Sequence, residues 1–177
     1  MKFFASFIVF LLFLNGFATA QTLIQDFCKK ASAKNPKLKF DFCINSLQQD
    51  PPSKAATNLK DLLVPSINTA AGQTSTVIGI IDQIIKEAKY GENILTTLRG
   101  CRYMFNKGVL VDISYALVAI KSGDYKEAHR FLDYGLTFPS GCDYEFEKIK
   151  QHSPITNDTN VLYQKILIPL SVSEMLL

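Results

Sequence analysis

The chain has 177 residues, a hydrophobic fraction of 47% and a formal net charge of +3, from 19 Lys and Arg against 16 Asp and Glu. This composition is that of a globular domain, and the charge is too small and too scattered to form a basic surface for nucleic acid. With two His and four Cys, the chain offers little material for a zinc cluster or a Ser-His-Asp triad.

The first twenty residues have the features of a secretory signal peptide. Lys2 precedes an apolar run over 3–14, and the small residues at 18–20 suit cleavage by signal peptidase. The alternative is an uncleaved anchor, but the run is short for a membrane span and no later stretch looks apolar enough to cross a bilayer. We therefore expect 1–20 to be removed and the mature chain, 21–177, to be soluble, secreted and without a membrane partner.

A short helical hairpin is expected over 21–52. Apolar residues recur at helical spacing in 22–34 and again in 40–49, and Asn35-Pro36 interrupts the pattern between them. Since short connections force neighbouring helices to run antiparallel, these two segments should pack side by side.

The remaining segment, 53–177, predicts an all-α, up-down-up-down four-helix bundle. Apolar residues recur at steps of three and four, the connections are short, and no repeat or long linker divides the segment. The expected helices are 59–88, 92–122, a third that begins after Asp124, and 156–177, with Leu177 facing inward.

Glycine and proline residues are expected to shape these helices. Pro65 should kink the first bundle helix or delay its start, and Gly91 should end it. Pro139 should kink or interrupt the third helix, and Pro169 should kink the fourth.

The clearest helix boundary lies near the middle of the bundle segment. Gly123 suits the left-handed residue after a helix end, and Asp124 suits the N-cap of the next helix. Glu127 follows at the spacing of a capping box.

The cysteines are expected to form disulfides, because an oxidising route favours them over metal thiolates. Four Cys allow three pairings. Cys28 and Cys43 lie symmetrically about the first hairpin turn, and Cys101 and Cys142 lie at nearly equal distances from Gly123. The symmetry predicts Cys28–Cys43 and Cys101–Cys142, with crossed pairing or free thiols as the alternative.

The sequence contains no set of residues at the spacing that a catalytic site or a metal site would need. His129 is expected on a polar helix face and His152 in a turn, and neither has a partner at a ligand or triad spacing. Asp143, Glu145 and Glu147 alternate with aromatic residues and are expected at the surface. We therefore expect a protein that is not an enzyme, with no cofactor and no metal.

One modification motif is present. Asn157-Asp158-Thr159 is an N-glycosylation sequon, placed at the start of the last expected helix. In a secreted chain such a site can be occupied or left empty.

Several motifs together resemble the plant invertase and pectin methylesterase inhibitor family, most of all its invertase inhibitor branch. The resemblance covers the mature chain and implies the hairpin, the bundle, consecutive disulfides and inhibition of a carbohydrate-active enzyme in the cell wall (apoplast) or vacuole. The motifs are the Cys pattern, Asp41-Phe42-Cys43, Lys121-Ser122-Gly123-Asp124-Tyr125 and Ser153-Pro154-Ile155-Thr156.

The expected partner is invertase, with pectin methylesterase as the alternative and a non-inhibitory extracellular binding protein as a second alternative; we expect a monomer. The turn 121–125 is the expected wedge that enters the target's active site. Established invertase inhibitors of the family carry Pro-Lys-Phe there, whereas this chain has Ser122-Gly123-Asp124-Tyr125. The competing interpretation is that Gly123 and Asp124 only end one helix and cap the next.

Overall fold

The computed structural model describes residues 21–177, which form helices and connecting turns and contain no strand. The predicted signal peptide, residues 1–20, lies outside the described residues. Within the described part the all-α prediction is confirmed, and both disulfides pair as the symmetry of the sequence predicts, Cys28 with Cys43 and Cys101 with Cys142.

The N-terminal hairpin consists of a helix over 21–34 and α2 (Phe40–Gln49), joined by the Cys28–Cys43 disulfide. A short helix that the sequence analysis missed, α3 (Pro51–Lys54), follows directly. It forms because proline is tolerated in the first turn of a helix, where its missing N–H would have no partner. The Asp50 carboxylate accepts a hydrogen bond of 2.9 Å from the Ser53 N–H and caps it.

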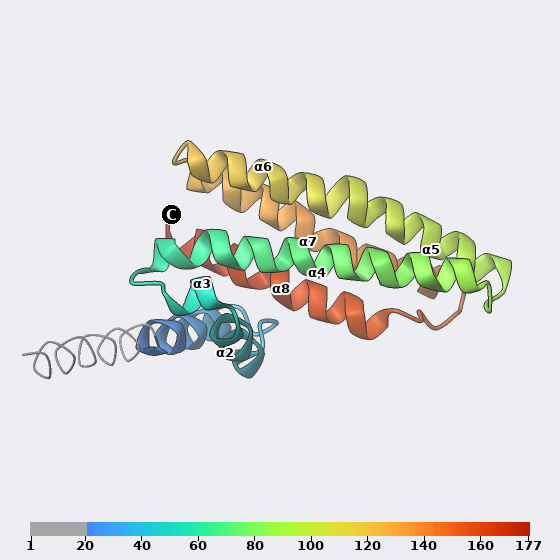
Figure 1. Ribbon diagram of the computed structural model, residues 1–177, viewed down its shortest axis with the longest axis horizontal. Helices are drawn as coiled ribbons and strands as arrows, with labels where there is room; N and C mark the ends of the chain where they lie inside the picture. Colours follow the sequence, from blue (N-terminus) through green and yellow to red (C-terminus); the bar gives the residue numbers. More distant parts are fainter. Residues whose placement is uncertain (1–20) are drawn as a thin grey trace, which may run out of the picture.

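Four long helical rods form the bundle, and successive rods run antiparallel (Figure 1). Helix α4 packs against α8, α8 against α7, and α7 against α6, while α4 also contacts α5 and α6 and so closes the ring. The rods are α4 (Leu59–Glu87), then α5 (Glu92–Met104) continued by a π-helical segment (Phe105–Val109) and α6 (Leu110–Lys121), then α7 (Tyr125–Lys148) and α8 (Thr156–Met175).

Helix α4 spans almost the whole of the expected range, 59–88, but different residues from those expected set its ends. Asn58 and Asp61 form a reciprocal capping box, so the helix starts at Leu59 and Pro65 does not delay it. The helix ends at Ala88, whose φ of 49° is left-handed, and not at Gly91. Gly91 has a φ of −62° and stands at the N-cap of α5 instead.

The second rod contains a π-helical turn that its sequence pattern did not reveal. Gly108 lies in this turn against the ring of Phe138 on α7, and a Cβ added at Gly108 would overlap that ring. A π turn inserts one residue into the helix and widens it locally. The absent side chain of Gly108 thus lets the two helices approach closely here.

The two later prolines do not interrupt their helices. Helix α7 continues through Pro139, and α8 continues through Pro169. Both prolines are buried, and α7 and α8 pack along each other. A proline removes one main-chain hydrogen bond, and the surrounding tertiary contacts hold the helix on both sides of it.

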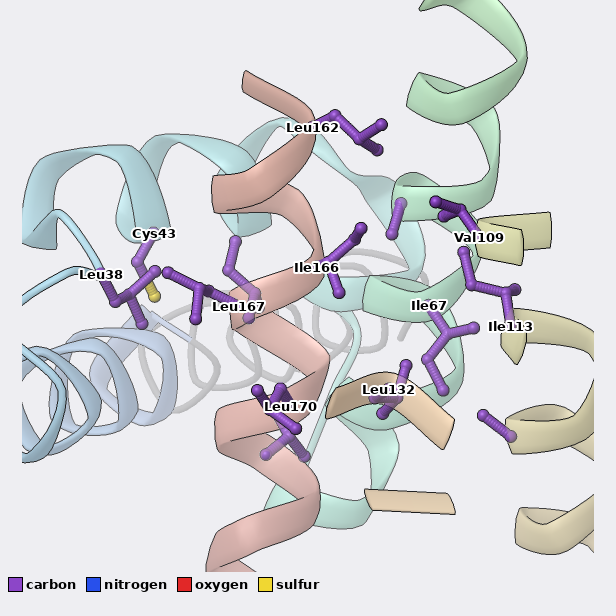
Figure 2. Packing of buried hydrophobic residues seen from close by; sticks show 14 of the residues in the cluster. Leu38, Cys43, Ile67, Val109, Ile113, Leu132, Leu162, Ile166, Leu167 and Leu170 are labelled. Carbon is purple, nitrogen blue, oxygen red and sulfur yellow. The ribbon is translucent and has the colours of Figure 1, made fainter. Parts of the chain in front are cut away.

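The core runs along the bundle axis and extends under the hairpin. Ile67, Val109, Leu132 and Ile166 come from the four rods and meet in the centre, while Leu167 on the other face of α8 lies beside the hairpin (Figure 2). Leu177 was expected inward, but α8 ends at Met175 and Leu177 is 66% exposed.

Polar contacts fasten the hairpin to α8. The Gln164 side chain accepts a hydrogen bond from the Lys39 N–H at 2.9 Å and donates one to the Lys37 carbonyl at 2.8 Å. One residue on, Lys165 Nζ donates to Ser46 Oγ at 2.7 Å. Burial lowers the pKa of Lys165, and Asp50 partly opposes this. The hairpin is thereby held in one position against the bundle.

The second rod, Glu92–Lys121, is long and apolar enough to cross a membrane by length and composition, so the sequence-based expectation that no later stretch qualifies is wrong. One such helix is weak evidence for a span, because the core helix of a bundle passes the same test. Leu98, Phe105 and Ile113 on this rod are buried in the core with the other helices.

Candidate interaction surface

The turn between α6 and α7 has the geometry that its sequence predicts. Gly123 has a φ of 79°, and its N–H bonds to the Ile120 carbonyl at 3.0 Å. Asp124 Oδ1 accepts the Glu127 N–H at 2.9 Å, the predicted cap. The capping box is only half formed, because the Glu127 carboxylate pairs with Arg130 instead.

The five residues expected to form the wedge do not share one environment. Lys121, Ser122, Gly123 and Asp124 are exposed. Tyr125 is half-buried, and the Lys60 ammonium lies 5.5 Å from its ring centroid. A projecting tip therefore exists, but Tyr125 belongs partly to the bundle wall.

An exposed aromatic surface adjoins this turn, and the sequence analysis missed it. Tyr115 stacks on Phe131 with centroids 5.1 Å apart, and the Arg130 guanidinium lies 4.5 Å from the Phe131 centroid and 5.3 Å from that of Tyr134. Tyr115, Val118 and Tyr134 remain 51%, 63% and 50% exposed. We call these five residues the turn-end patch. The available signal was the place of Tyr115, Val118 and Tyr134 outside the apolar stripes of α6 and α7.

Charges at the turn-end patch are paired locally. Hydrogen bonding to Arg130 lowers the pKa of Glu127, and the same contact raises the pKa of Arg130. Burial raises the pKa of Asp112, while Arg130 acts in the opposite direction. Exposed pairs of this kind add little to stability, so their main effect is to hold the guanidinium over the aromatic rings.

The opposite end of the bundle holds the sequon, Asn157 to Thr159, in the first turn of α8, and we call it the sequon end. It also carries exposed aromatic residues. Tyr103 on α5 is 67% exposed and Tyr144 on α7 is 57% exposed, with Lys148 Nζ 4.9 Å from the Tyr144 centroid. A shallow open depression lies between these helices, lined by Thr96, Thr97, Gly100, Tyr103, Met104 and Glu145. It has no convergent set of polar groups of the kind that small-molecule sites show.

Of the three acidic residues expected at the surface of the sequon end, Glu147 is exposed, whereas Asp143 and Glu145 are partly buried. Asp143 is half-buried, and both of its carboxylate oxygens lie within 3.1 Å of the Thr159 hydroxyl. Burial raises the pKa of Asp143, Glu147 adds to this, and the Thr159 hydrogen bond opposes it. Asn157 of the sequon is exposed in the first turn of α8.

The histidines lie apart from each other. His152 is exposed in the α7–α8 connection. His129 is half-buried, rather than on a polar face, and its Nδ1 lies 3.1 Å from the Oγ of buried Ser173. Ser173 Oγ donates to the Leu170 carbonyl, so this serine is tied into α8. Across residues 21–177, no group of three or more His, Cys, Asp or Glu side chains is arranged to hold a metal ion.

Known proteins resemble this chain along nearly its whole length. The family model described as plant invertase/pectin methylesterase inhibitor matches residues 22–172. "Pectinesterase inhibitor 12" of Arabidopsis thaliana is 48% identical over 99% of this chain and all of its own length. "Putative invertase inhibitor" of Platanus orientalis is 29% identical over 90% of this chain and 93% of its own.

Solved structures support the fold. A mutant form of a pectin methylesterase inhibitor from Arabidopsis superposes with a TM-score of 0.68 at 16% identity, covering 81% of this chain and 96% of that one. A second pectin methylesterase inhibitor from Arabidopsis thaliana gives 0.61 at 17% identity, covering 87% and 95%. At these sequence identities the likeness shows a shared fold and nothing about the target.

Proposed function

This chain belongs to the plant invertase/pectin methylesterase inhibitor family, and from that premise we propose that it inhibits a pectin methylesterase. The observation that carries the proposal is the 48% identity, end to end, with a relative named as a pectinesterase inhibitor. The relative named for invertase is 29% identical. The relatives thus favour pectin methylesterase as the target. The resemblance to the invertase inhibitor branch favours invertase instead.

We propose that the protein inhibits its target by binding alone and takes no part in a chemical step. An inhibitor that offers no reactive group must act by occlusion, so its potency depends on complementarity at an interface. The convex helical surface of the bundle and the shallowness of its depression agree with a protein that inserts into, or covers, a cleft in its partner. We propose that it is not itself catalytic.

The proposal also places the protein outside the cytosol, in the cell wall or, by the same route, the vacuole. Two disulfides suit an oxidising compartment. The predicted signal peptide at 1–20 supplies the route.

The turn-end patch is the proposed contact surface, with the exposed tip of the turn at its edge. Tyrosine and arginine are enriched among the residues that dominate interface energetics, and tyrosine buries a large area at a modest cost in side-chain entropy. The patch presents both residue types on adjoining helices, held in place by stacking and by the Glu127–Arg130 pair. The turn adds Lys121 beside it.

The target is tested by titrating the purified, oxidised chain into a pectin methylesterase assay and an invertase assay at mildly acid pH. We expect saturable loss of pectin methylesterase activity and unchanged invertase activity. The opposite pattern would establish invertase as the target. If neither enzyme responds, the non-inhibitory binding protein becomes the better interpretation.

The surface is tested with three variants in the same assay. Val118→Ala with Tyr134→Ala removes exposed side chains from the turn-end patch, and we expect inhibition to weaken at least tenfold, or about 1.4 kcal/mol. Lys121→Glu alters the tip of the turn alone. Tyr103→Ala with Tyr144→Ala is the matched control at the sequon end, and we expect no change. Loss of inhibition in the control, with the patch variant unaffected, would move the contact surface to the other end.

A further inference from the structure

We propose that Asn157 is an N-glycan acceptor only while the chain is unfolded, and that closure of α8 onto α7 ends its modification. The acceptor is the side-chain amide, and the donor belongs to the class of lipid-linked oligosaccharide diphosphates. This inference does not rest on which enzyme the protein inhibits. It rests on the different environments of the first and third residues of one sequon.

The two recognition elements of the sequon are separated by folding. The motif is defined by the asparagine and by the hydroxyl residue two positions later, so a transferase must reach both. In the folded chain Asn157 is exposed, whereas Thr159 is 0% exposed. Both residues are also fixed in the first turn of α8. In the folded protein the acceptor Asn157 is therefore accessible to a transferase, whereas Thr159, which completes the motif, is not.

The Thr159 hydroxyl is held from two sides. It lies 3.0 and 3.1 Å from the two carboxylate oxygens of Asp143 on α7, and 3.0 Å from the Thr156 carbonyl. The Asp143 contact joins α7 to α8 and forms only when the helices dock. Release of the hydroxyl would break these contacts and leave a half-buried carboxylate without its donor, which is costly.

In the glycan transfer, the side-chain amide of Asn157 is the one reacting group that this protein supplies. The Nδ2 of Asn157 forms a bond to the anomeric carbon of the oligosaccharide, and the bond from that carbon to the diphosphate oxygen breaks. The lipid diphosphate leaves with the electron pair, and the proton that Nδ2 loses passes to a base of the transferase. The acceptor amide must be free to move into the transferase, which an unfolded segment allows.

The folded structure accommodates the product. The Asn157 side chain faces solvent, so an attached glycan would not enter the core. The sequon and the α6–α7 turn lie at opposite ends of the bundle (Figure 1). Helix α7, with 24 residues, separates them by about 36 Å at 1.5 Å per residue. A glycan at Asn157 therefore leaves the turn-end patch uncovered.

The test uses the full chain, synthesised in a translation extract supplemented with microsomes, with and without dithiothreitol. Reductant prevents the Cys101–Cys142 bridge, whose second cysteine adjoins Asp143, and so prolongs the unfolded state. Occupancy is measured as the fraction of chain whose mobility an endoglycosidase changes. We expect occupancy at Asn157 to rise at least twofold with reductant, and Asn157→Gln to abolish the shift.

A matched control places a sequon where folding buries neither element, although the Thr57 hydroxyl donates a local hydrogen bond of 2.7 Å to Asp61 Oδ2. Ala55→Asn in the Asn157→Gln background creates an Asn-Ala-Thr motif at 55–57, and both Ala55 and Thr57 are exposed outside the long helices. We expect its occupancy to be independent of reductant. Equal partial occupancy of Asn157 under both conditions would overturn the dependence on folding. Absence of glycan at Asn157 in both, with the control modified, would overturn the site itself.

Discussion

The two ends of α7 differ in the contacts that hold them. At the turn end, the chain reverses through Gly123 and Asp124 and uses hydrogen bonds between residues no more than five positions apart. At the sequon end, the connection depends on Asp143 holding Thr159, 16 residues away. Both ends have local hydrogen bonds, such as that from the Gln151 N–H to the Phe146 carbonyl, but the sequon end adds a partly buried hydrogen bond between two helices.

This difference separates the two roles proposed for the molecule. A turn fixed by its own sequence can present side chains to a partner with little dependence on the rest of the bundle. An end that is completed by a contact between docked helices is available to other proteins before folding and closed afterwards.

Removal of the Cys101–Cys142 disulfide should have the largest effect. The loop-entropy model gives about 4 kcal/mol for this bridge and about 3 kcal/mol for Cys28–Cys43, because the closed loop is longer. Unfolding by urea of the paired Cys→Ser variants measures both. We also expect hydrogen exchange to increase more at the α7–α8 connection than at Gly123, and equal increases would contradict the contrast.

Thr159→Val should lower the free energy of unfolding by about 1–3 kcal/mol. It keeps the shape of the side chain and removes the hydroxyl, which leaves the Asp143 carboxylate without its donor. Thermal or urea unfolding of bacterially produced protein measures the change. Thr76→Val, at an exposed threonine on α4, is the control and should change stability by less than about 0.5 kcal/mol. Equal effects at the two sites would show that the Asp143 contact adds nothing.

Asp124→Ala should cost about 1 kcal/mol, because the Glu127 N–H loses its capping partner. The loss should stay local to the start of α7, with hydrogen exchange at the sequon end unchanged. Asp133→Ala, at an exposed position inside the same helix, serves as the comparison. If both substitutions cost the same, the cap is not what stabilises the turn end.

The pH dependence of Asp143 should give the smallest effect. Burial raises its pKa in the folded chain, so the folded form holds the proton more tightly than the unfolded form. The resulting stabilisation is complete below the ordinary Asp pKa and is lost as the pH rises through the folded-state value. The unfolding free energy of the wild type, minus that of Asp143→Asn, should therefore decrease between about pH 3 and about pH 6. An increase over this range would show that the Thr159 hydrogen bond outweighs burial.

Sequence reasoning succeeded where the determining signals are close together along the chain. Gly123 and Asp124 predicted a helix end and a cap, and the symmetry of the cysteines predicted both bridges. It failed at the end of α4, because Ala88 adopts a left-handed conformation that glycine was expected to supply.

The remaining misses depend on contacts between helices. The burial of Asp143 and the absence of an interruption at Pro139 follow from the packing of α7 against its neighbours, which no local pattern records; a kink at Pro139 stays a prediction. The turn-end patch has no sequence signature of its own, because helical periodicity marks the apolar stripes that form the core. Residues such as Val118, apolar and 63% exposed, stand out only once the buried face of α6 is known.

The close fit of Gly108 against Phe138 has a consequence for how related sequences vary. Because any side chain at position 108 would overlap the Phe138 ring, the two positions are coupled through space. Relatives that carry a larger residue at the first position should carry a smaller one at the second, or should have lost the inserted residue that makes the π turn. This interface should therefore evolve by paired substitution and by single-residue insertion or deletion, rather than by independent changes at each site.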